Sequence, residues 1–133
     1  MAAAREETIS IHSDEDVVRA RQAVRQWAVD LGFRLVDQTK VVTAASELAR
    51  NTLIHGGGGT MQLASLQLDT RRGLQLTFED KGPGIPDVSQ AMMNGYTTGS
   101  GLGLGLGGAK RLSNEFEITS SPEGTRVRIV RWL

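Results

Sequence analysis

A glycine-rich stretch between Asp80 and Gly108 constrains this sequence more than any other feature. Nine of the chain's 16 glycines fall within these residues, which read DKGPGIPDVSQAMMNGYTTGSGLGLGLGG. Each glycine inside a helix costs about 1 kcal/mol relative to alanine, because glycine has the most conformational freedom to lose. Glycine-rich backbone that leads into a helix N-terminus offers free N–H groups and a favourable dipole. The stretch therefore predicts a polyphosphate site, and the alternative is a flexible surface loop.

Length and composition indicate one globular domain that spans residues 1–133. Fifteen basic and fifteen acidic residues balance to a formal charge of zero, so we expect no nucleic-acid or membrane partner. The chain has no cysteine, which excludes disulfides and thiolate metal sites. The N-terminus, MAAAREETIS, lacks the apolar segment of a secretion signal, and no apolar run is long enough to cross a membrane. We therefore expect a cytoplasmic protein.

The first half of the chain predicts one strand and two helices. Residues 7–12 (ETISIH) alternate polar and apolar side chains, which is typical of a short edge strand. An amphipathic helix is predicted over residues 14–31, with Ser13 or the residue after it as N-cap and Gly32 as C-cap. A second helix is predicted over about residues 36–55. The four glycines that follow it are interpreted as a flexible exit from this helix.

The second half predicts two hairpins that flank a third helix. Strands are predicted over residues 61–68, 74–78, 116–119 and 125–132. Turns are expected at residues 69–73 and 122–124, a helical turn at 87–93, a loop at 94–101, and a helix that begins glycine-rich within 102–114. The order β-α-α-β-β-α-β-β predicts an α/β (α+β) two-layer sandwich, in which helices cover one face of a mixed, mainly antiparallel sheet.

Glu47 and Asn51 are candidates for chemistry, because four residues of helix place them one turn apart on the same face. A carboxylate can orient or deprotonate a hydroxyl group. An amide oxygen can help to hold Mg²⁺, a hard cation that prefers oxygen ligands together with substrate phosphates. His55 continues this face by one more turn. Taken alone, such a pair is usually no more than a solvated helix face, so its meaning depends on its neighbours.

Asp80 ends a predicted strand and is followed by Gly82 and Gly84. A carboxylate at this position could accept a hydrogen bond from an exocyclic amine, while the glycine backbone lets a planar base approach. Thr125 opens the last strand and could place a hydroxyl near the same base. The alternative is a turn-capping aspartate and an ordinary β-forming threonine.

Several well-known nucleotide motifs are absent. Gly103, Gly105 and Gly108 spell G-x-G-x-x-G, but no apolar strand precedes them, which excludes a dinucleotide-binding fingerprint. No Gly-Lys-Ser/Thr occurs, so there is no Walker A loop. The Val-Ala-Ile-Lys, His-Arg-Asp and Asp-Phe-Gly signatures of eukaryotic-type protein kinases are missing as well.

Four segments together resemble the N, G1, G2 and G3 boxes of the GHKL (Bergerat) ATP-binding superfamily, which includes gyrase, histidine kinases and MutL. They are Glu47–Asn51 (ELARN), Asp80–Gly84 (DKGPG), Gly99–Gly105 (GSGLGLG) and Gly124–Thr125 (GT). Order and spacing match over essentially the whole chain, so the resemblance implies the Bergerat ATP-binding fold. Within the superfamily, the compact length and the segments 46–51, 82–87 and 110–116 are similar to the RsbT-type serine/threonine switch kinases of stressosomes.

The resemblance implies a role for each box. Glu47 would be the base that activates the acceptor hydroxyl, and Asn51 would bind Mg²⁺. Asp80 would bond the adenine amino group of ATP, and residues 99–105 would form a lid around the phosphates. The implied nucleotide-binding residues are Asn51, Asp80, Gly82, Gly84, Ile85, Gly99, Ser100, Gly101, Leu102, Gly103, Leu104, Gly105 and Thr125. Lys110 and Arg111 could contact phosphate or the partner, and the alternative that we favour is that they are exposed helix charges.

The resemblance also implies partners, and two functions follow from it. The first is an ATP-dependent protein serine/threonine kinase that phosphorylates STAS-domain scaffold and antagonist proteins of a stressosome, leaves them, and activates a downstream phosphatase-type regulator. The second is an anti-sigma factor kinase that sequesters a sigma subunit and phosphorylates its STAS-domain antagonist. Both functions share the ATP boxes, and the pair His55-Gly56 is similar to the anti-sigma kinases.

Overall fold

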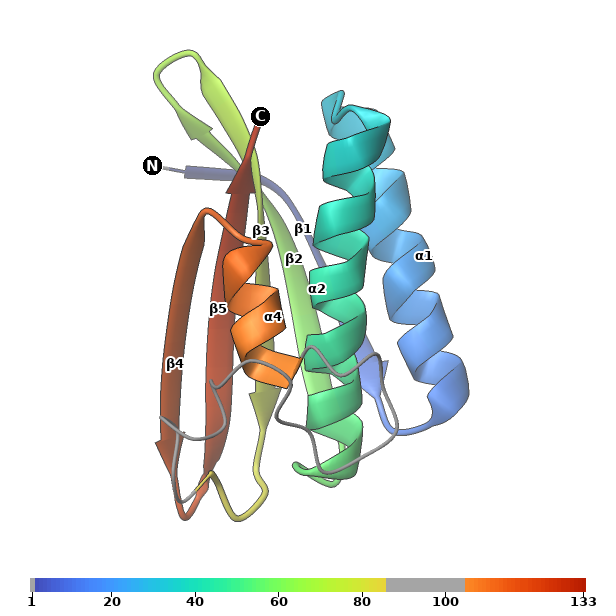
Figure 1. Cartoon of the computed structure of the whole chain (residues 1–133), viewed down its shortest axis with the longest axis vertical. Coiled ribbons are helices and arrows are strands. Elements are labelled where there is room, and N and C mark those ends of the chain that lie inside the picture. The colour runs from blue at the N-terminus through green and yellow to red at the C-terminus, as the bar shows by residue number, and fades with distance from the viewer. Residues whose placement is uncertain (1, 86–104) are drawn as a thin grey trace.

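The computed structural model describes residues 2–85 and 105–133 (Figure 1). Its elements are β1 (Ala2–Ile11), α1 (Asp14–Leu31), α2 (Leu35–Ile54), β2 (Gly59–Leu68), β3 (Arg71–Asp80), α4 (Gly105–Arg111), β4 (Glu115–Ser121) and β5 (Gly124–Trp132). The predicted element order is confirmed. The helical turn and the loop predicted over residues 87–101 lie outside the described residues.

The five described strands form one sheet in the order β1-β2-β3-β5-β4, and α1, α2 and α4 cover one of its faces (Figure 1). This arrangement confirms the predicted two-layer sandwich. All four pairings of the described strands are antiparallel. The sequence predicted a mixed, mainly antiparallel sheet, and the described strands include no parallel pair. β1 lies at an edge as predicted, although it begins five residues earlier than the pattern indicated.

The hairpin between β2 and β3 is tighter than the sequence predicted. Leu68 pairs with Arg71, so the turn has two residues rather than five, and Asp69 adopts a left-handed φ of 55°. Gly73 was predicted to belong to the turn, but it lies within β3. A Cβ atom on Gly73 would lie 2.7 Å from Cε3 of Trp132 on β5, so this glycine makes room for an indole ring.

The core lies between the helices and the inner face of the sheet. Trp27 of α1 is 1% exposed, and its Nε1 donates a hydrogen bond of 2.8 Å to Oε1 of Glu7 on β1. The buried apolar side chains of the cluster include Val24, Val41, Leu48, Met61, Leu63, Leu76, Phe78, Leu106, Ala109 and Ile129. Within the described residues, no helix combines the length and the apolar content that a membrane crossing requires.

Arg131 of β5 connects three elements on the inner face of the sheet. Its Nη2 lies 2.7 Å from Oδ1 of Asp37 in the first turn of α2. Its Nη1 donates to the backbone oxygen of Leu112, directly after α4, at 3.2 Å. Because both bonds leave the same half-buried guanidinium, they hold α4 at a defined position beside α2.

The corner between β1 and α1 is held by a reciprocal set of caps. Ser13 is the N-cap, and its Oγ accepts a hydrogen bond from the amide of Asp16 at 3.2 Å. The Asp16 carboxylate in turn accepts from the amide of His12 at 2.9 Å and pairs with Arg19. These hydrogen bonds lower the pKa of Asp16, the one from Arg19 most strongly. Ser13 thus fulfils the predicted capping role, and Gly32 closes α1 with a left-handed φ of 90°.

We predict that Ser13→Ala lowers the free energy of unfolding by about 1 kcal/mol, because the amide of Asp16 loses its side-chain acceptor. Chemical denaturation measures this difference. Ser10→Ala is the matched control, since Ser10 is an exposed residue of β1 and caps no helix. Equal stability of the Ser13→Ala variant and the wild type would show that the cap contributes nothing.

Candidate functional site

Asn51, Asp80, Gly82, Gly84, Ile85 and Thr125 lie at one end of the sandwich. The C-terminal end of α2, the exit of β3 and the turn between β4 and β5 all meet there, at the lower end of the molecule in Figure 1. Asp80 is the last residue of β3, and it lies in register with Gly59 of β2 and with Thr125 of β5. Antiparallel pairing therefore brings together residues that are far apart in the sequence.

The two oxygens of Asp80 have different surroundings. Its Oδ1 accepts hydrogen bonds from the amide of Gly82 at 2.9 Å and from the amide of Thr125 at 3.3 Å. No described residue forms a hydrogen bond with its Oδ2. One oxygen therefore fastens the loop after β3 to the start of β5, and the other forms no hydrogen bond within the described part of the chain.

Glycines bring the end of α2 into direct contact with Asp80. A Cβ atom on Gly56 would overlap Cγ of Asp80, and one on Gly82 would lie 2.8 Å from Cα of Gly56. A Cβ atom on Gly59 would overlap the backbone oxygen of Glu79. The interpretation of Gly56 to Gly59 as only a flexible helix exit is therefore wrong, because close packing requires two of these glycines. The signal in the sequence is the glycine run itself, which is equally typical of a flexible loop.

A hydroxyl that the sequence analysis did not single out organises the loop beside Asp80. Ser120 of β4 accepts a hydrogen bond from the amide of Ile85 at 2.7 Å, and its Oγ lies 2.9 Å from Oγ1 of Thr125. Gly84 adopts a φ of 82°, and a Cβ atom on it would overlap the backbone oxygen of Ser121. The sequence signal that could have identified Ser120 is the hairpin between β4 and β5, which pairs Ser120 with Thr125.

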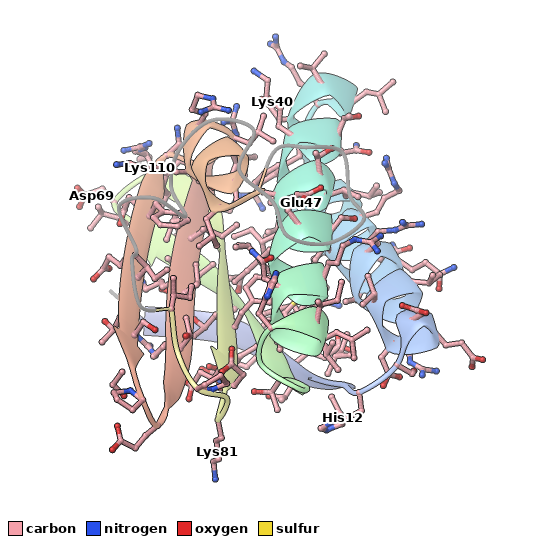
Figure 2. The ribbon with its side chains drawn as sticks, turned by 60° about the horizontal axis from the view of Figure 1, so that its bottom comes forward. His12, Lys40, Glu47, Asp69, Lys81 and Lys110 are labelled. Atoms are coloured by element: carbon pink, nitrogen blue, oxygen red, sulfur yellow. The ribbon has the colours of Figure 1, made fainter. Side chains whose placement is uncertain are left out.

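Glu47 and Asn51 lie on α2, one turn apart, as predicted. Glu47 is 5% exposed, and Figure 2 shows it in the middle of the helix. Asn51 is half-buried in the last turn, and its side-chain amide forms no hydrogen bond with a described residue. Its backbone oxygen accepts from the amides of His55 and Gly56 at 3.0 and 3.2 Å. His55 is the C-cap residue of α2, and it is exposed.

α4 begins at Gly105 and presents almost no side chains in its first turns. Gly105, Gly107 and Gly108 are buried where α4 packs against α2, as the sequence predicted for a glycine-rich helix start. Lys110 and Arg111 are exposed in the last turn. The expected lid residues Gly99, Ser100, Gly101, Leu102, Gly103 and Leu104 lie outside the described residues.

A hollow of about 360 Å³ lies at the same end of the molecule. Its lining consists of His12, Gly58, Gly59, Thr60, Glu79, Asp80 and Lys81. Thr60 pairs with Glu79, and the neighbouring pair Met61–Phe78 faces the core, so strand alternation places this hollow toward the face opposite the helices. The lining of the hollow includes neither Glu47 nor Asn51.

The polar groups of the site can be compared with the ATP and Mg²⁺ that the resemblance implies. A carboxylate oxygen that has no hydrogen-bond partner among the described residues, and that lies between side-chain-free glycines, fits the exocyclic amine of a planar base. A half-buried amide without a described partner, at the end of a helix, fits a Mg²⁺ ion that shares its other ligands with phosphates. No cluster of three or more His, Cys, Asp or Glu residues suited to a metal occurs in residues 2–85 and 105–133. The arrangement is therefore compatible with a nucleotide and its metal ion.

Comparison with known proteins gives relatives that match nearly the whole chain. A serine/threonine-protein kinase, RsbT of Bacillus subtilis (strain 168), is 43% identical over 126 residues, which cover 94% of this chain and 95% of the relative. An anti-sigma F factor of Bacillus licheniformis is 31% identical over 122 residues, which cover 86% of this chain and 82% of that protein.

Solved structures support the same fold. The RsbU and RsbW domains of a Mycobacterium tuberculosis protein superpose with a TM-score of 0.66 at 19% identity, covering 96% of this chain and 32% of that longer chain. The SiaB–SiaC complex of Pseudomonas aeruginosa gives a TM-score of 0.53 at 12% identity, covering 98% of this chain and 91% of that one. Identities this low establish the fold alone. The family model described as the histidine kinase-like ATPase domain matches residues 12–131, and this chain belongs to that family.

Proposed function

We propose that this chain is an ATP-dependent protein serine/threonine kinase of a stressosome-type partner-switching pathway. Residues 1–133 act as one domain in the cytoplasm. The kinase phosphorylates STAS-domain scaffold and antagonist proteins, leaves them, and activates a downstream phosphatase-type regulator. The observation that carries this proposal is the 43% identity to a serine/threonine-protein kinase, with nearly complete coverage of both chains.

Membership of an ATPase-domain family implies that the chain uses ATP. In our proposal, Oδ2 of Asp80 accepts a hydrogen bond from the adenine amino group. Gly82, Gly84 and Ile85 supply backbone beside the base, and Thr125 supplies a hydroxyl that is already oriented by Ser120. The closeness of Gly56 to Asp80 supports this assignment, because a side chain there would displace the carboxylate.

Phosphoryl transfer depends mainly on positioning and on neutralising charge. Asn51 would bind Mg²⁺ together with phosphate oxygens, and residues 99–105 would surround the phosphates with backbone N–H groups. Glu47 would accept the proton of the serine or threonine hydroxyl. The hydroxyl oxygen would at the same time attack the γ-phosphorus, and ADP would depart. Glu47 and Asn51 are supported in these roles by their spacing on α2, which places both on one face of the helix.

The second candidate is an anti-sigma factor kinase. It is favoured by the similarity to an anti-sigma F factor, which is 31% identical to this chain. Incubation of the purified chain with Mg²⁺, γ-labelled ATP, and STAS-domain and sigma proteins from the same genome tests both candidates. Label on a serine or threonine of a STAS-domain protein, followed by release of that protein, is the expected result. ATP-dependent capture of a sigma factor would select the second candidate, and absence of label on every protein would contradict both.

We predict that Asp80→Asn weakens ATP binding about 100-fold or more, since an amide nitrogen in place of Oδ2 meets the adenine amine as a second donor. The asparagine oxygen can still accept from Gly82 and Thr125, so we expect the fold to persist. Calorimetric titration with ATP and Mg²⁺ measures the affinity. Glu79→Gln is the matched control, because Glu79 is the preceding strand residue, faces away from α2 and pairs with exposed Arg126. Unchanged affinity in Asp80→Asn would remove this residue from the site.

We predict that Glu47→Gln binds ATP with wild-type affinity but transfers phosphate about 100-fold more slowly, because the amide cannot accept the hydroxyl proton. Single-turnover transfer to a STAS-domain protein measures the rate, and calorimetry measures the affinity. Glu15→Gln is the control, since Glu15 is an exposed carboxylate in the first turn of α1. Transfer by Glu47→Gln at the wild-type rate would mean that the assigned base is wrong.

A further inference from the structure

The corner between α1 and α2 exposes large apolar side chains at the end of the molecule away from the candidate site. Leu35 is 68% exposed and Val36 is 65% exposed, the two highest values among the large hydrophobic residues that the structure describes. Both belong to the first turn of α2. A single exposed leucine is ordinary, whereas adjacent apolar residues on a rigid helix end form a surface that water covers poorly.

Neighbouring segments extend this apolar surface. A Cβ atom on Gly32, the C-cap of α1, would lie 3.8 Å from Cδ2 of Leu133 and 3.7 Å from Nη2 of Arg72. The amide of Leu133 donates a hydrogen bond of 2.9 Å to the backbone oxygen of Arg72. Leu133 is itself 47% exposed. We call the surface formed by Gly32, Arg34, Leu35, Val36, Arg72 and Leu133 the α1–α2 corner.

The charged side chains of the α1–α2 corner, Arg34 and Arg72, are both basic. Arg34 and Arg72 are exposed, and neither forms an ion pair with a described residue. The nearest acidic side chain along α2, Asp37, is already bound to Arg131. Arg34 also stands at the N-cap of α2, where the helix dipole adds positive potential. The corner therefore combines apolar area with two basic side chains that form no ion pair with a described residue.

We propose that the α1–α2 corner is a docking surface for a partner protein that presents an amphipathic helix with carboxylates beside its apolar face. Its apolar side chains would cover Leu35 and Val36, and its carboxylates would pair with Arg34 and Arg72. Charge complementarity selects this partner over a second copy of the chain, since a two-fold contact would oppose like charges. The proposal does not depend on the proposed kinase activity.

Docking at this corner leaves the candidate site open. Lys40, one turn into α2, and Lys81, directly after β3, lie at opposite ends of the molecule in Figure 2. Asp80 and the end of α2 belong to the end marked by Lys81. A partner at the α1–α2 corner and a nucleotide beside Asp80 can therefore bind at the same time.

A designed helical peptide of about 18 residues, long enough to fold on the surface, tests this proposal. It carries leucines on one face and glutamates beside them, and a second peptide has lysine in place of every glutamate. We expect the glutamate peptide to bind the ¹⁵N-labelled chain and to shift the amide resonances of residues 32–36, 72 and 133. Saturating ATP and Mg²⁺ should leave this affinity unchanged, whether or not the nucleotide site is assigned correctly.

Matched variants identify the surface. Val36→Ser and Arg34→Glu should each weaken binding about tenfold, which is the effect of losing one buried contact or one charge pair. Both positions are exposed, and a carboxylate at a helix N-terminus is favourable, so the melting temperature should not fall. Val18→Ser and Arg21→Glu, at exposed positions of α1, should change binding less than twofold.

Three results would overturn the proposal. They are equal binding of the lysine peptide, resonance shifts confined to other surfaces, and absence of binding by either peptide. Vesicles of phosphatidylcholine and phosphatidylserine test a membrane as the occupant, because basic and apolar groups together also suit an anionic bilayer. The corner would be assigned to a membrane instead if the wild-type chain sediments with these vesicles and binds neither peptide. In that case Val36→Ser and Arg34→Glu should abolish the sedimentation.

Discussion

The contact between the Asp80 carboxylate and Gly56 is the constraint on which the candidate site depends. It requires that β3 and α2 end at the same level, so that the last strand residue meets the first residue after the helix C-cap. The antiparallel pairing of β3 with β2 and β5 sets the height of Asp80. The core beneath α2 sets the height of Gly56. Sheet register and helix packing therefore determine together whether the carboxylate points into the space between the two layers.

Much of this arrangement could be predicted from the sequence, because it rests on local patterns. Apolar periodicity located α1 to the residue, and the Ser13 and Gly32 caps defined its ends. The order of elements and the position of Asp80 at a strand exit followed from the same patterns. These features depend on near neighbours in the chain, which a single sequence displays directly.

What the sequence could not predict depends on contacts between distant residues. Glycine signals a turn when its φ must be positive, and it signals close packing when another group occupies the place of its Cβ atom. Gly73 and Gly56 belong to the second kind, since Trp132 and Asp80 occupy those places. The role of Ser120 likewise requires that the loop carrying Ile85 folds back onto β4. No pattern within a window of a few residues distinguishes these cases.

The position of α4 is a further consequence of its glycines. A helix of seven residues is marginal on its own, and Gly105, Gly107 and Gly108 contribute no side chains to its packing. Its C-terminal end must therefore be held, and the bond from Arg131 to the oxygen of Leu112 does so. The Nε of Arg131 is buried without a described hydrogen-bond partner, which is an unfavourable arrangement that the paired Nη groups offset. A helix with three glycines in its first turns can thus keep its backbone beside α2, because Leu106 and Ala109 pack in the core and the bond from Arg131 lies at the opposite end.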